Sequence, residues 1–282
     1  MQTFTTVKEM QNWCREQKRA GKTIGLVPTM GYLHQGHLAL VNESRRKCDL
    51  TIVSIFVNPI QFGVGEDFED YPRDLARDSE LLDNEQVDAL FAPSVREMYP
   101  PGYNTFVEVA GEMSEKLCAQ SRPGHFRGVT TVVSKLFNIC LPDEAFFGQK
   151  DAQQVMILEK MAEELNFPLT ITRVPIIREN DGLALSSRNV YLTPELRTQA
   201  LVLNRSLLAA RDLILGGERN AARVKAALEE SIAASPDADI VYAEIYDAAN
   251  LKDVENIEGR VLMALAVKFG STRLIDNLIV EV

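Results

Sequence analysis

The 282-residue chain contains only three histidines, four cysteines and one tryptophan. The four cysteines, Cys14, Cys48, Cys118 and Cys140, are scattered and form no CxxC pair, which excludes the usual zinc-finger spacing. We therefore expect buried free thiols in a reducing cytosol rather than disulfides or a zinc site. Because histidines are so few, any place where two of them occur together calls for a chemical explanation.

Long apolar runs are also absent. No run approaches the ~18 residues needed to span a bilayer, so we expect no membrane association. Residues 1–21 lack the apolar core of a signal peptide. They read instead as an amphipathic helix, with Val7, Met10, Trp13 and Cys14 on one side. Together with the cysteine usage, this predicts a cytoplasmic protein.

Positive charge is in the minority, because 30 Lys and Arg residues stand against 40 Asp and Glu residues, for a net charge of −10. A nucleic-acid-binding surface would normally show a basic stripe, so we expect no nucleic-acid partner. An acidic protein that handles an anionic ligand must gather its positive groups locally. Clusters of Lys, Arg and His are therefore the features to look for.

Short apolar runs alternate with helical patterns over about the first 175 residues. The expected strands are 23–28, 50–57, 88–91, 105–109, 145–147 and 169–174, and the expected helices are 37–48, 73–84, 128–140 and 151–165. The run LTIVSIFV (50–57) is nearly all apolar and β-branched, which suits a strand covered on both faces. Strands that alternate with helices predict a doubly wound α/β domain with a parallel sheet.

The pattern changes from about Ile176. Two helices are expected within 194–234, broken near Gly216 and Gly217, and strands are expected at 240–246, 260–267 and 273–282. This order predicts a second, smaller α+β domain, with boundaries at 1–176 and 177–282. The junction, IRENDGLALSSRN (177–189), is polar and contains glycine, so it reads as a hinge or a loop.

Two of the three histidines, His34 and His37, lie in TMGYLHQGHL (29–38), directly after the expected strand at 23–28. In an open α/β sheet this loop lies at the carboxyl end of the strand, where ligands bind. Gly36 lets the backbone approach a ligand, and N–H groups at the start of the next helix attract anions. Three interpretations stand: a phosphate site, a turn that the histidines merely satisfy, and a metal site that lacks a nearby third ligand. There is no GxxxxGK and no GxGxxG opening a helix, so any nucleotide is bound in another way.

Two further segments carry polar groups next to expected elements. FVNPIQF (56–62) offers the amides of Asn58 and Gln61 to a small polar substrate, or is simply an Asn-Pro turn. SRPGHFRGVTTVV (121–133) gathers Arg122, His125 and Arg127 before a helix. This second cluster fits an anion-attracting surface, a subunit contact or a solvated loop equally well.

The last two segments lie at 146–154 and 183–189. In FFGQKDAQQ, Gly148 and Lys150 lead to Asp151 as a helix N-cap, with Gln154 on the same helical face. A normal capped helix with an exposed lysine would give the same pattern. In LALSSRN, the SSR tripeptide supplies two hydroxyls and a guanidinium suited to phosphate.

Taken together, five segments in this order and at these spacings resemble the pantothenate synthetase (pantoate–β-alanine ligase) family. They are VPTMGYLHQGH, SIFVNPIQF, SRPGHFRGV, GQKDAQQ and DGLALSSRN, and the resemblance extends over essentially the whole chain to the terminal TRLIDN. HQGH also resembles the HIGH signature of nucleotidylyl transferases and class I aminoacyl-tRNA synthetases. The SSR element resembles the second phosphate-binding loop of that superfamily.

The resemblance implies a fold and a reaction. The fold would be a Rossmann-like doubly wound parallel sheet that binds ATP and pantoate (1–176), followed by a smaller α+β C-terminal lid domain (177–282). The family forms pantoyl adenylate and pyrophosphate from pantoate and ATP with Mg²⁺. It then forms pantothenate and AMP with β-alanine. Its members are cytoplasmic homodimers whose substrates are small molecules.

The resemblance also implies roles for individual residues. His37, His34, Lys150 and Arg188 would be catalytic, with His37 the family's named proton donor, although we favour a hydrogen-bond donor to phosphate. ATP would contact Met30, Gly31, His34, Gly36, His37, Gly148, Gln149, Lys150, Asp151, Ile177, Leu185, Ser186, Ser187 and Arg188. Gln61 and Gln154 would hold pantoate, with Gln61 also near β-alanine and Asn58 on the amine side. No metal-contacting residue is implied.

The chain departs from the family's usual GEKD block, because Gln149 stands where the glutamate is expected. The change removes a negative charge beside Lys150. Two other interpretations stay open. One is a nucleotidylyl transferase that keeps the nucleotide on its product, and the other is a nucleotide-binding sensor without catalysis, which Gln149 alone favours.

Overall fold

The computed structural model describes residues 1–282, and the chain divides into two compact units. Unit 1 comprises Met1–Val109, Arg122–Gln149 and Ile157–Pro175, and unit 2 comprises Ala110–Ser121, Lys150–Met156 and Ile176–Val282. The main change of architecture falls between Pro175 and Ile176, and two short earlier segments also belong to unit 2. The roles suggested by the sequence, ligand binding and a lid, stay predictions.

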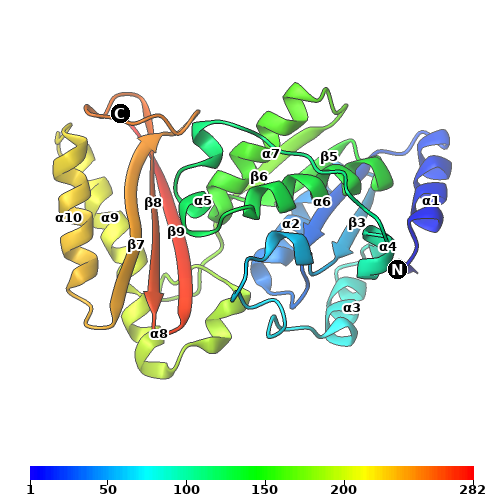
Figure 1. Ribbon diagram of the computed structural model, residues 1–282, viewed down its shortest axis with the longest axis horizontal. Coiled ribbons are helices and arrows are strands. Elements are labelled where there is room, and N and C mark those ends of the chain that lie inside the picture. The colour runs from blue at the N-terminus through cyan, green and yellow to red at the C-terminus, as the bar shows by residue number, and fades with distance from the viewer. The chain divides into compact units, whose positions relative to one another are not determined.

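Unit 1 is built on a six-stranded sheet in the order β1-β4-β3-β2-β5-β6, in which every pairing is parallel (Figure 1). The strands are β1 (Gln2–Phe4), β2 (Ile24–Thr29), β3 (Leu50–Ile55), β4 (Ala89–Phe91), β5 (Glu144–Gly148) and β6 (Thr170–Val174). The predicted α/β architecture is confirmed. The central strands β2 and β3 are almost entirely buried, as the apolar run at 50–57 predicted.

Helices cover both faces of this sheet. They are α1 (Val7–Arg19), α2 (Gln35–Lys47), α3 (Leu75–Asn84), α4 (Val95–Met98), α6 (His125–Cys140) and the later part of α7 (Ala152–Glu164). Val27 and Val53 point to the face where Leu40 and Val41 of α2 and Leu82 of α3 complete one core. Side chains alternate along a strand, so the neighbouring strand residues face the other way, toward the side where α6 packs on β2 and α1.

The strand order reverses between β2 and β5. From β2 the chain moves outward to β3 and β4, and it then returns to the other side of β2 to form β5 and β6. At such a switch point the loops after the two strands diverge, and ligands of open α/β sheets bind at the carboxyl ends of the strands. The loop after β2 begins with Met30, and Gln149 follows β5 directly. Two of the predicted segments therefore start at this point of unit 1.

Two expectations about the edges of unit 1 are wrong. Residues 105–109 form no strand, because the helix beside them supplies their hydrogen bonds: Thr131 Oγ1 accepts the N–H of Val107 at 3.0 Å, and Thr130 Oγ1 donates to the Val107 carbonyl at 2.6 Å. The edge strand β1 was missed. It is only three residues long and mostly exposed, so it shows no apolar pattern, and its pairing with β4 decides its conformation.

Unit 2 contains a three-stranded antiparallel sheet in the order β7-β8-β9, with α9 and α10 packed along one side (Figure 1). The strands are β7 (Ala238–Asp247), β8 (Arg260–Phe269) and β9 (Thr272–Glu281). The helices are α5 (Cys118–Ser121), α8 (Pro194–Ala200), α9 (Val202–Leu215) and α10 (Ala221–Ala233), so three helices rather than two occupy 194–234. The predicted break at Gly216 and Gly217 is present.

Both faces of the small sheet are covered. Met263 and Leu265 of β8 face the core formed with α9 and α10, whereas Leu262 and Ala264 face a second cluster with Leu117 and Met156. The segments at 110–121 and 150–156 belong to unit 2 because they supply this second layer. All four cysteines are free, and three of them are buried. None of the helices is long and apolar enough to cross a membrane.

Candidate active site

The two histidines of the loop after β2 cap the N-terminus of α2, which begins at Gln35. His34 is the N-cap residue, and its Nδ1 accepts the backbone N–H of Gly36 at 3.1 Å. The Nδ1 of His37 accepts the backbone N–H of His34 at 3.4 Å, which completes a reciprocal capping box. The interval of three residues between the histidines is therefore the interval of a capping box.

This capping determines which ring nitrogen carries the proton. A backbone N–H can only donate, so Nδ1 of each ring is unprotonated, and a neutral imidazole then carries its proton on Nε2. The rings of His34 and His37 stack with 4.1 Å between centroids and 28° between planes. Positive charge on both stacked rings would be repulsive. With Nδ1 accepting, Nε2–H is the donor of each ring, at the positive end of a helix.

The first backbone N–H groups of α2 are used within the chain. That of Gly36 donates to His34 Nδ1, and that of His37 donates to the His34 carbonyl at 2.8 Å. The expectation that backbone N–H groups would attract the anion does not hold for these two groups. The groups at this helix end that suit an anionic ligand are instead the imidazole rings, supported by the helix dipole.

Asp78 of α3 holds the histidine loop in place. Its carboxylate accepts the backbone N–H of Tyr32 at 2.7 Å and that of Leu33 at 2.8 Å, and its side chain is fully buried. The loop needs this anchor, because Gly31 and Tyr32 both have positive φ angles, 83° and 49°. Burial raises the pKa of Asp78, and the two backbone N–H groups and Arg77 oppose that shift. The sequence offered only a lone aspartate in a charged helix and no sign of this role.

The two amides of FVNPIQF have different roles. Asn58 has no exposed surface: its Nδ2 donates to Gln61 Oε1 at 3.0 Å and to the Gly128 carbonyl at 3.1 Å, and its Oδ1 accepts the Tyr99 hydroxyl at 2.8 Å. It therefore orients Gln61 and has no surface for the predicted contact on the amine side. Gln61 accepts through Oε1, so its Nε2–H groups are directed elsewhere, to the Met30 sulfur at 3.3 Å. A thioether is a weak acceptor, which a ligand oxygen can replace.

The backbone of Gln61 is held from a second side by α6. Gly128 lies so close that an added Cβ would meet Gln61 Cα at 2.6 Å and Gln61 N at 2.7 Å. The His125 ring bonds the Gln61 carbonyl through Nδ1 at 2.8 Å and faces Arg122 through Nε2 at 3.0 Å. Because a guanidinium can only donate, Nε2 accepts and Nδ1 carries the proton. The third histidine thus supports Gln61.

The remaining charges of SRPGHFRGV are engaged within unit 1. Arg122 forms a two-point ion pair with Glu66, with nitrogen–oxygen distances of 2.8 Å and 2.6 Å. The guanidinium of Arg127 lies over the Phe106 ring at 3.9 Å. Arg122 therefore compensates a carboxylate and supports the Gln61 region, which leaves little of the anion-attracting surface considered from the sequence.

In unit 2, the SSR segment begins a short 3₁₀ helix, Ser187–Tyr191. Ser186 is its N-cap and accepts the backbone N–H of Arg188 at 3.2 Å, while Ser187 is buried. The preceding segment is braced internally, since Leu185 N–H donates to the Ile177 carbonyl at 3.0 Å. Of the two interpretations of 177–189, a loop built into unit 2 fits these bonds better than a hinge.

The block that follows β5 forms a 3₁₀ turn, Gln149–Asp151, and leads directly into α7. Lys150 and Asp151 are assigned to unit 2, with Gln154 in the first turn of α7. Gln153 is the structural member of the pair of glutamines: its Oε1 accepts the Cys118 N–H at 3.0 Å and its Nε2 donates to two backbone carbonyls. Gln154 is only half-buried, which suits the predicted ligand contact better.

The structure thus brings several predicted residues together within each unit. In unit 1 these are His34 with His37, and Met30 with Gln61 and Asn58; in unit 2 they are Ser186 to Arg188 with Ile177 and Leu185. Sequence reasoning missed Asp78, Tyr99 and the contact role of Gly128. A glycine inside an otherwise apolar, β-branched helix was the one available signal for the last of these.

Metal binding by the two histidines is disfavoured by their geometry. Nδ1 of each ring is committed to a backbone N–H, and no group of three His, Cys, Asp or Glu side chains is arranged to hold a metal ion. The zinc-site interpretation was already weak because no third ligand lies nearby. The phosphate-site interpretation is the one that agrees with the position and protonation of the rings.

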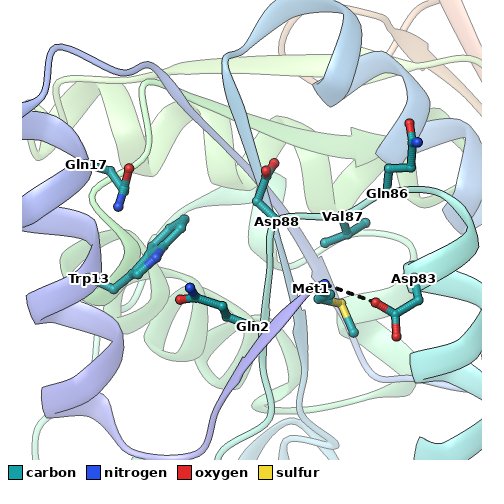
Figure 2. Close-up of a pocket in the computed structure, with 8 residues that line it drawn as sticks. All are labelled: Met1, Gln2, Trp13, Gln17, Asp83, Gln86, Val87 and Asp88. Carbon is teal, nitrogen blue, oxygen red and sulfur yellow. Dashed lines mark ion pairs between the residues drawn. The ribbon is translucent and has the colours of Figure 1, made fainter.

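A separate pocket of unit 1 lies near the amino ends of β1 and β4 (Figure 2). Its lining comes from α1, β1 and the turn after α3, namely Met1, Gln2, Trp13, Gln17, Asp83, Gln86, Val87 and Asp88. The Met1 amino group pairs with Asp83 at 3.1 Å, as Figure 2 shows. None of the predicted site residues lines it, and ligands of open α/β sheets bind at the opposite, carboxyl edge.

A doubly wound parallel sheet with paired histidines at its switch point, and with an oriented amide that reaches the same loop through Met30, is the arrangement of an α/β enzyme of the nucleotide-binding class. Comparison with known proteins makes this specific. The family model for Pantoate-beta-alanine ligase matches residues 2–279. The chain belongs to the pantoate–β-alanine ligase family.

Individual relatives match this chain over its full length. The pantothenate synthetase of Syntrophomonas wolfei is 65% identical over 282 residues, and that of Heliobacterium modesticaldum is 58% identical, each with 100% of both chains covered. The crystal structure of pantothenate synthetase from Thermus thermophilus superposes with a TM-score of 0.93 at 46% identity and covers 99% of each chain. That of the Francisella tularensis ligase, complexed with beta-gamma ATP and beta-alanine, has a TM-score of 0.80 at 32% identity, covering 99% of this chain and 97% of that chain.

Proposed function

We propose that the protein condenses pantoate with β-alanine to pantothenate in a reaction driven by ATP. The pantoate carboxylate attacks the α-phosphorus of ATP, which forms pantoyl adenylate and releases pyrophosphate. The β-alanine amine then attacks the carbonyl carbon of the adenylate, and AMP leaves. Support comes from family membership over residues 2–279 and from the related ligase whose crystal structure holds the ATP and β-alanine ligands.

The observation that carries the proposal is the pair of stacked histidine rings at the N-terminus of α2, next to the switch point of the sheet. Charge develops on the α-phosphoryl oxygens and on the departing pyrophosphate, so positioned N–H donors lower the barrier. His34 and His37 carry their protons on Nε2. Giving up that proton would turn a neutral ring into an imidazolate. His37 therefore acts as a hydrogen-bond donor to phosphate and not as an acid in this arrangement.

The orientation of Gln61 fits pantoate. Because Asn58 donates to Gln61 Oε1, Gln61 presents N–H groups and selects an acceptor. The carboxylate and hydroxyl oxygens of pantoate are acceptors, whereas the ammonium group of β-alanine can only donate and its carboxylate is the one acceptor at its other end. Gln61 thus holds pantoate, and Gln154 supplies a second amide for the same substrate. The remaining contacts to ATP come from Met30, Gly31, Gly36, Gly148, Gln149, Asp151, Ile177 and Leu185 to Arg188.

Lys150 and Arg188 supply the positive charge that an acidic protein must concentrate for ATP. Lysine binds phosphate as a point charge, and arginine can bind two of its oxygens at once. With Ser186 and Ser187 they form the proposed phosphate-binding group of unit 2. The second step requires that water be kept from hydrolysing the adenylate before the amine attacks.

Magnesium would enter with ATP. Mg²⁺ usually keeps several waters and binds through substrate phosphates and one or two carboxylates, so it needs no preformed cluster of acidic residues. The ion would neutralise charge on the triphosphate.

We further propose that the protein is a homodimer and that it is cytoplasmic, the latter in keeping with its free thiols. Ultracentrifugation of the purified protein would test the oligomeric state.

Pantoate-dependent exchange of labelled pyrophosphate into ATP, measured without β-alanine, tests the adenylation step. We expect exchange only when pantoate is present, and AMP together with pantothenate only after β-alanine is added. Formation of ADP and phosphate would contradict the proposal, because the intermediate would then be an acyl phosphate. A product that keeps the nucleotide would favour the nucleotidylyl-transferase interpretation instead.

Gln149 is the one residue that favours a sensor without catalysis. We expect the Gln149→Glu variant and the parent to have similar rates, because glutamine keeps the size and hydrogen-bonding capacity of glutamate beside Lys150. A large gain in rate for Gln149→Glu would show that the parent is impaired and would support the sensor.

A further inference from the structure

The dipeptide Asp276-Asn277 is a buried polar pair in the middle of β9. The exposed fraction is 3% for each residue, and their neighbours on the strand, Ile275 and Leu278, are apolar. They belong to the terminal TRLIDN stretch, to which the proposed function gives no role. A charged side chain in such a strand is costly unless it is fully paired, so its partners matter.

Asp276 is paired with Arg178, the second residue of the segment that leads to the SSR tripeptide. Arg178 Nη1 donates to Oδ2 at 2.6 Å and Nη2 donates to Oδ1 at 2.8 Å. The same Nη1 donates to the Gly182 carbonyl at 3.1 Å, so the guanidinium also closes the turn from 178 to 182. Arg178 further pairs with Ala184 in an isolated β-bridge. The Asp276 carboxylate thereby fixes the backbone that runs directly into Leu185 to Arg188.

Asn277 acts on the other segment of unit 2 that is proposed to bind ATP. Its Nδ2 donates to the main-chain carbonyl of Lys150 at 2.9 Å. Its own backbone N–H donates to Asp276 Oδ1 at 2.8 Å, which orients the carboxylate for Arg178. Two adjacent residues of one strand therefore contact the two segments that supply Lys150 and Arg188.

We propose that Asp276 and Asn277 are positioning residues: Asp276 holds the Ser186–Arg188 loop, and Asn277 holds the Lys150 backbone, each in a position suited to the phosphates of ATP. The inference rests on the proposed function, because it takes Lys150 and Arg188 as ATP contacts. Replacing a buried ion pair by apolar residues often leaves stability unchanged or improves it. We therefore attribute the Arg178–Asp276 ion pair to the geometry that it gives the ATP-binding segments and not to a gain in stability.

The first test measures KM for ATP, kcat and the melting temperature of Asp276→Asn, Asn277→Leu and Arg178→Lys. Arg178→Lys keeps the charge but loses the two-point geometry. We expect KM for ATP to rise by about 10- to 100-fold in Asp276→Asn, by analogy with the loss of partners that orient metal-binding side chains. KM for β-alanine should change little. The matched control is Ser206→Ala, which removes the buried Ser206–Ser231 hydrogen bond of 2.8 Å elsewhere in unit 2.

Double-mutant cycles separate positioning from a purely structural role. In an Arg188→Ala background, Asp276→Asn should lose most of its effect on KM for ATP, whereas in a Lys150→Ala background it should keep it. Asn277→Leu should show the reverse pattern. Equal, additive effects in both backgrounds, or changes in KM no larger than those of Ser206→Ala, would overturn the proposal. If Asp276→Asn fails to fold, Arg178→Lys replaces it in the cycle, because it disturbs the same ion pair. A parent protein without pantoate-dependent exchange would instead refute the proposed function.

Discussion

The two groups of candidate residues are held in place by different means. In unit 1, the side chains of His34, His37 and Gln61 are oriented by a capping box, the Asn58 amide and the Tyr99 hydroxyl, while the Asp78 carboxylate anchors the histidine loop through two backbone N–H groups. In unit 2, the Ser186–Arg188 loop is positioned by ion pairs. Arg178 pairs with Asp276, and Arg197 pairs with Glu179 and Asp181 at 2.6 Å and 2.7 Å.

The difference follows from the architecture on which each group is mounted. At the edge of a parallel sheet, strand ends and helix N-termini already aim the side chains, so hydrogen bonds from neighbouring amides, hydroxyls and one buried carboxylate complete their positioning. The SSR segment lies in a loop without regular strands and needs stronger, longer-reaching contacts. We therefore expect unit 1 to be sensitive to the shape of side chains and unit 2 to be sensitive to charge.

The largest effect should come from the imidazole of His37. His37→Ala removes a phosphate donor, and loss of such a donor commonly lowers the rate by about 10² to 10³. His37→Gln is the matched variant, because glutamine at this position can complete a capping box without the imidazole. Pyrophosphate exchange and melting temperature should be measured for both. We expect low activity in both and a drop in stability only in His37→Ala. Normal exchange in His37→Gln would show that the histidine only caps the helix.

A somewhat smaller effect is expected from Gly128→Ala. The added methyl would collide with the Ile60 carbonyl and with Gln61 Cα, which must then move. A displacement of about 1 Å at a substrate-positioning residue can cost about 10² in rate. KM for pantoate should rise more than KM for ATP. Ser134→Ala in the same helix, which loses a contact to the Met161 sulfur, is the control. An unchanged KM for pantoate would disprove the role of Gln61.

Tyr99→Phe tests how much a single hydroxyl contributes to the positioning of Gln61. It leaves Asn58 Oδ1 without its donor, so the amide can turn over and release Gln61. One neutral hydrogen bond contributes about 0.5–1.5 kcal/mol, which limits the rise in KM for pantoate to about tenfold. Tyr103→Phe is the matched control, because the Tyr103 ring lies against Tyr99 at 5.0 Å between centroids. Equal effects of the two substitutions would exclude the proposed relay.

The smallest effect concerns acid stability through Glu66. Burial alone would raise its pKa, but the hydrogen bond and charge of Arg122 outweigh burial, so the pKa lies below its ordinary value of 4.5. A lowered pKa in the folded state means that this carboxylate stabilises the protein above about pH 4.5 and that the contribution is lost as the pH falls further.

The Glu66→Gln variant tests whether Glu66 stabilises the protein at neutral pH and loses that contribution in acid. Its melting temperature should lie below that of the parent at pH 7, and the difference should shrink as the pH falls below about 4.5. Glu43→Gln is the control, because the Glu43–Arg46 pair is more exposed and contributes less. A difference between parent and Glu66→Gln that grows toward low pH would contradict the assignment.

Much of the fold could be read from local pattern. The buried strands at 50–57 and 23–28 and the amphipathic helices after them are strong periodic signals, and the observed β2, β3 and α2 lie within a few residues of the expected ranges. Residues 105–109 were misread because Thr130 and Thr131 of α6, which are distant in sequence, take over the hydrogen bonds that a strand would make.

The candidate site was predictable where chemistry and spacing occur together in a short segment. His34 and His37, the SSR tripeptide and Lys150 each stand in such a segment. Asp78, Tyr99 and Gly128 could not be found in this way, because each acts on a loop that lies far away in sequence: Asp78 on Tyr32 and Tyr99 on Asn58.

The sequence by itself determined the α/β class, the family and the short segments that carry donors for an anionic substrate, because these depend on local periodicity and residue type. Only the tertiary structure decided the protonation of the two histidines, the direction of the Gln61 amide and the burial of Asn58. The last two depend on partners that folding brings close, the Tyr99 hydroxyl and the backbone of α6, whereas the histidines depend on the formation of the helix start at α2.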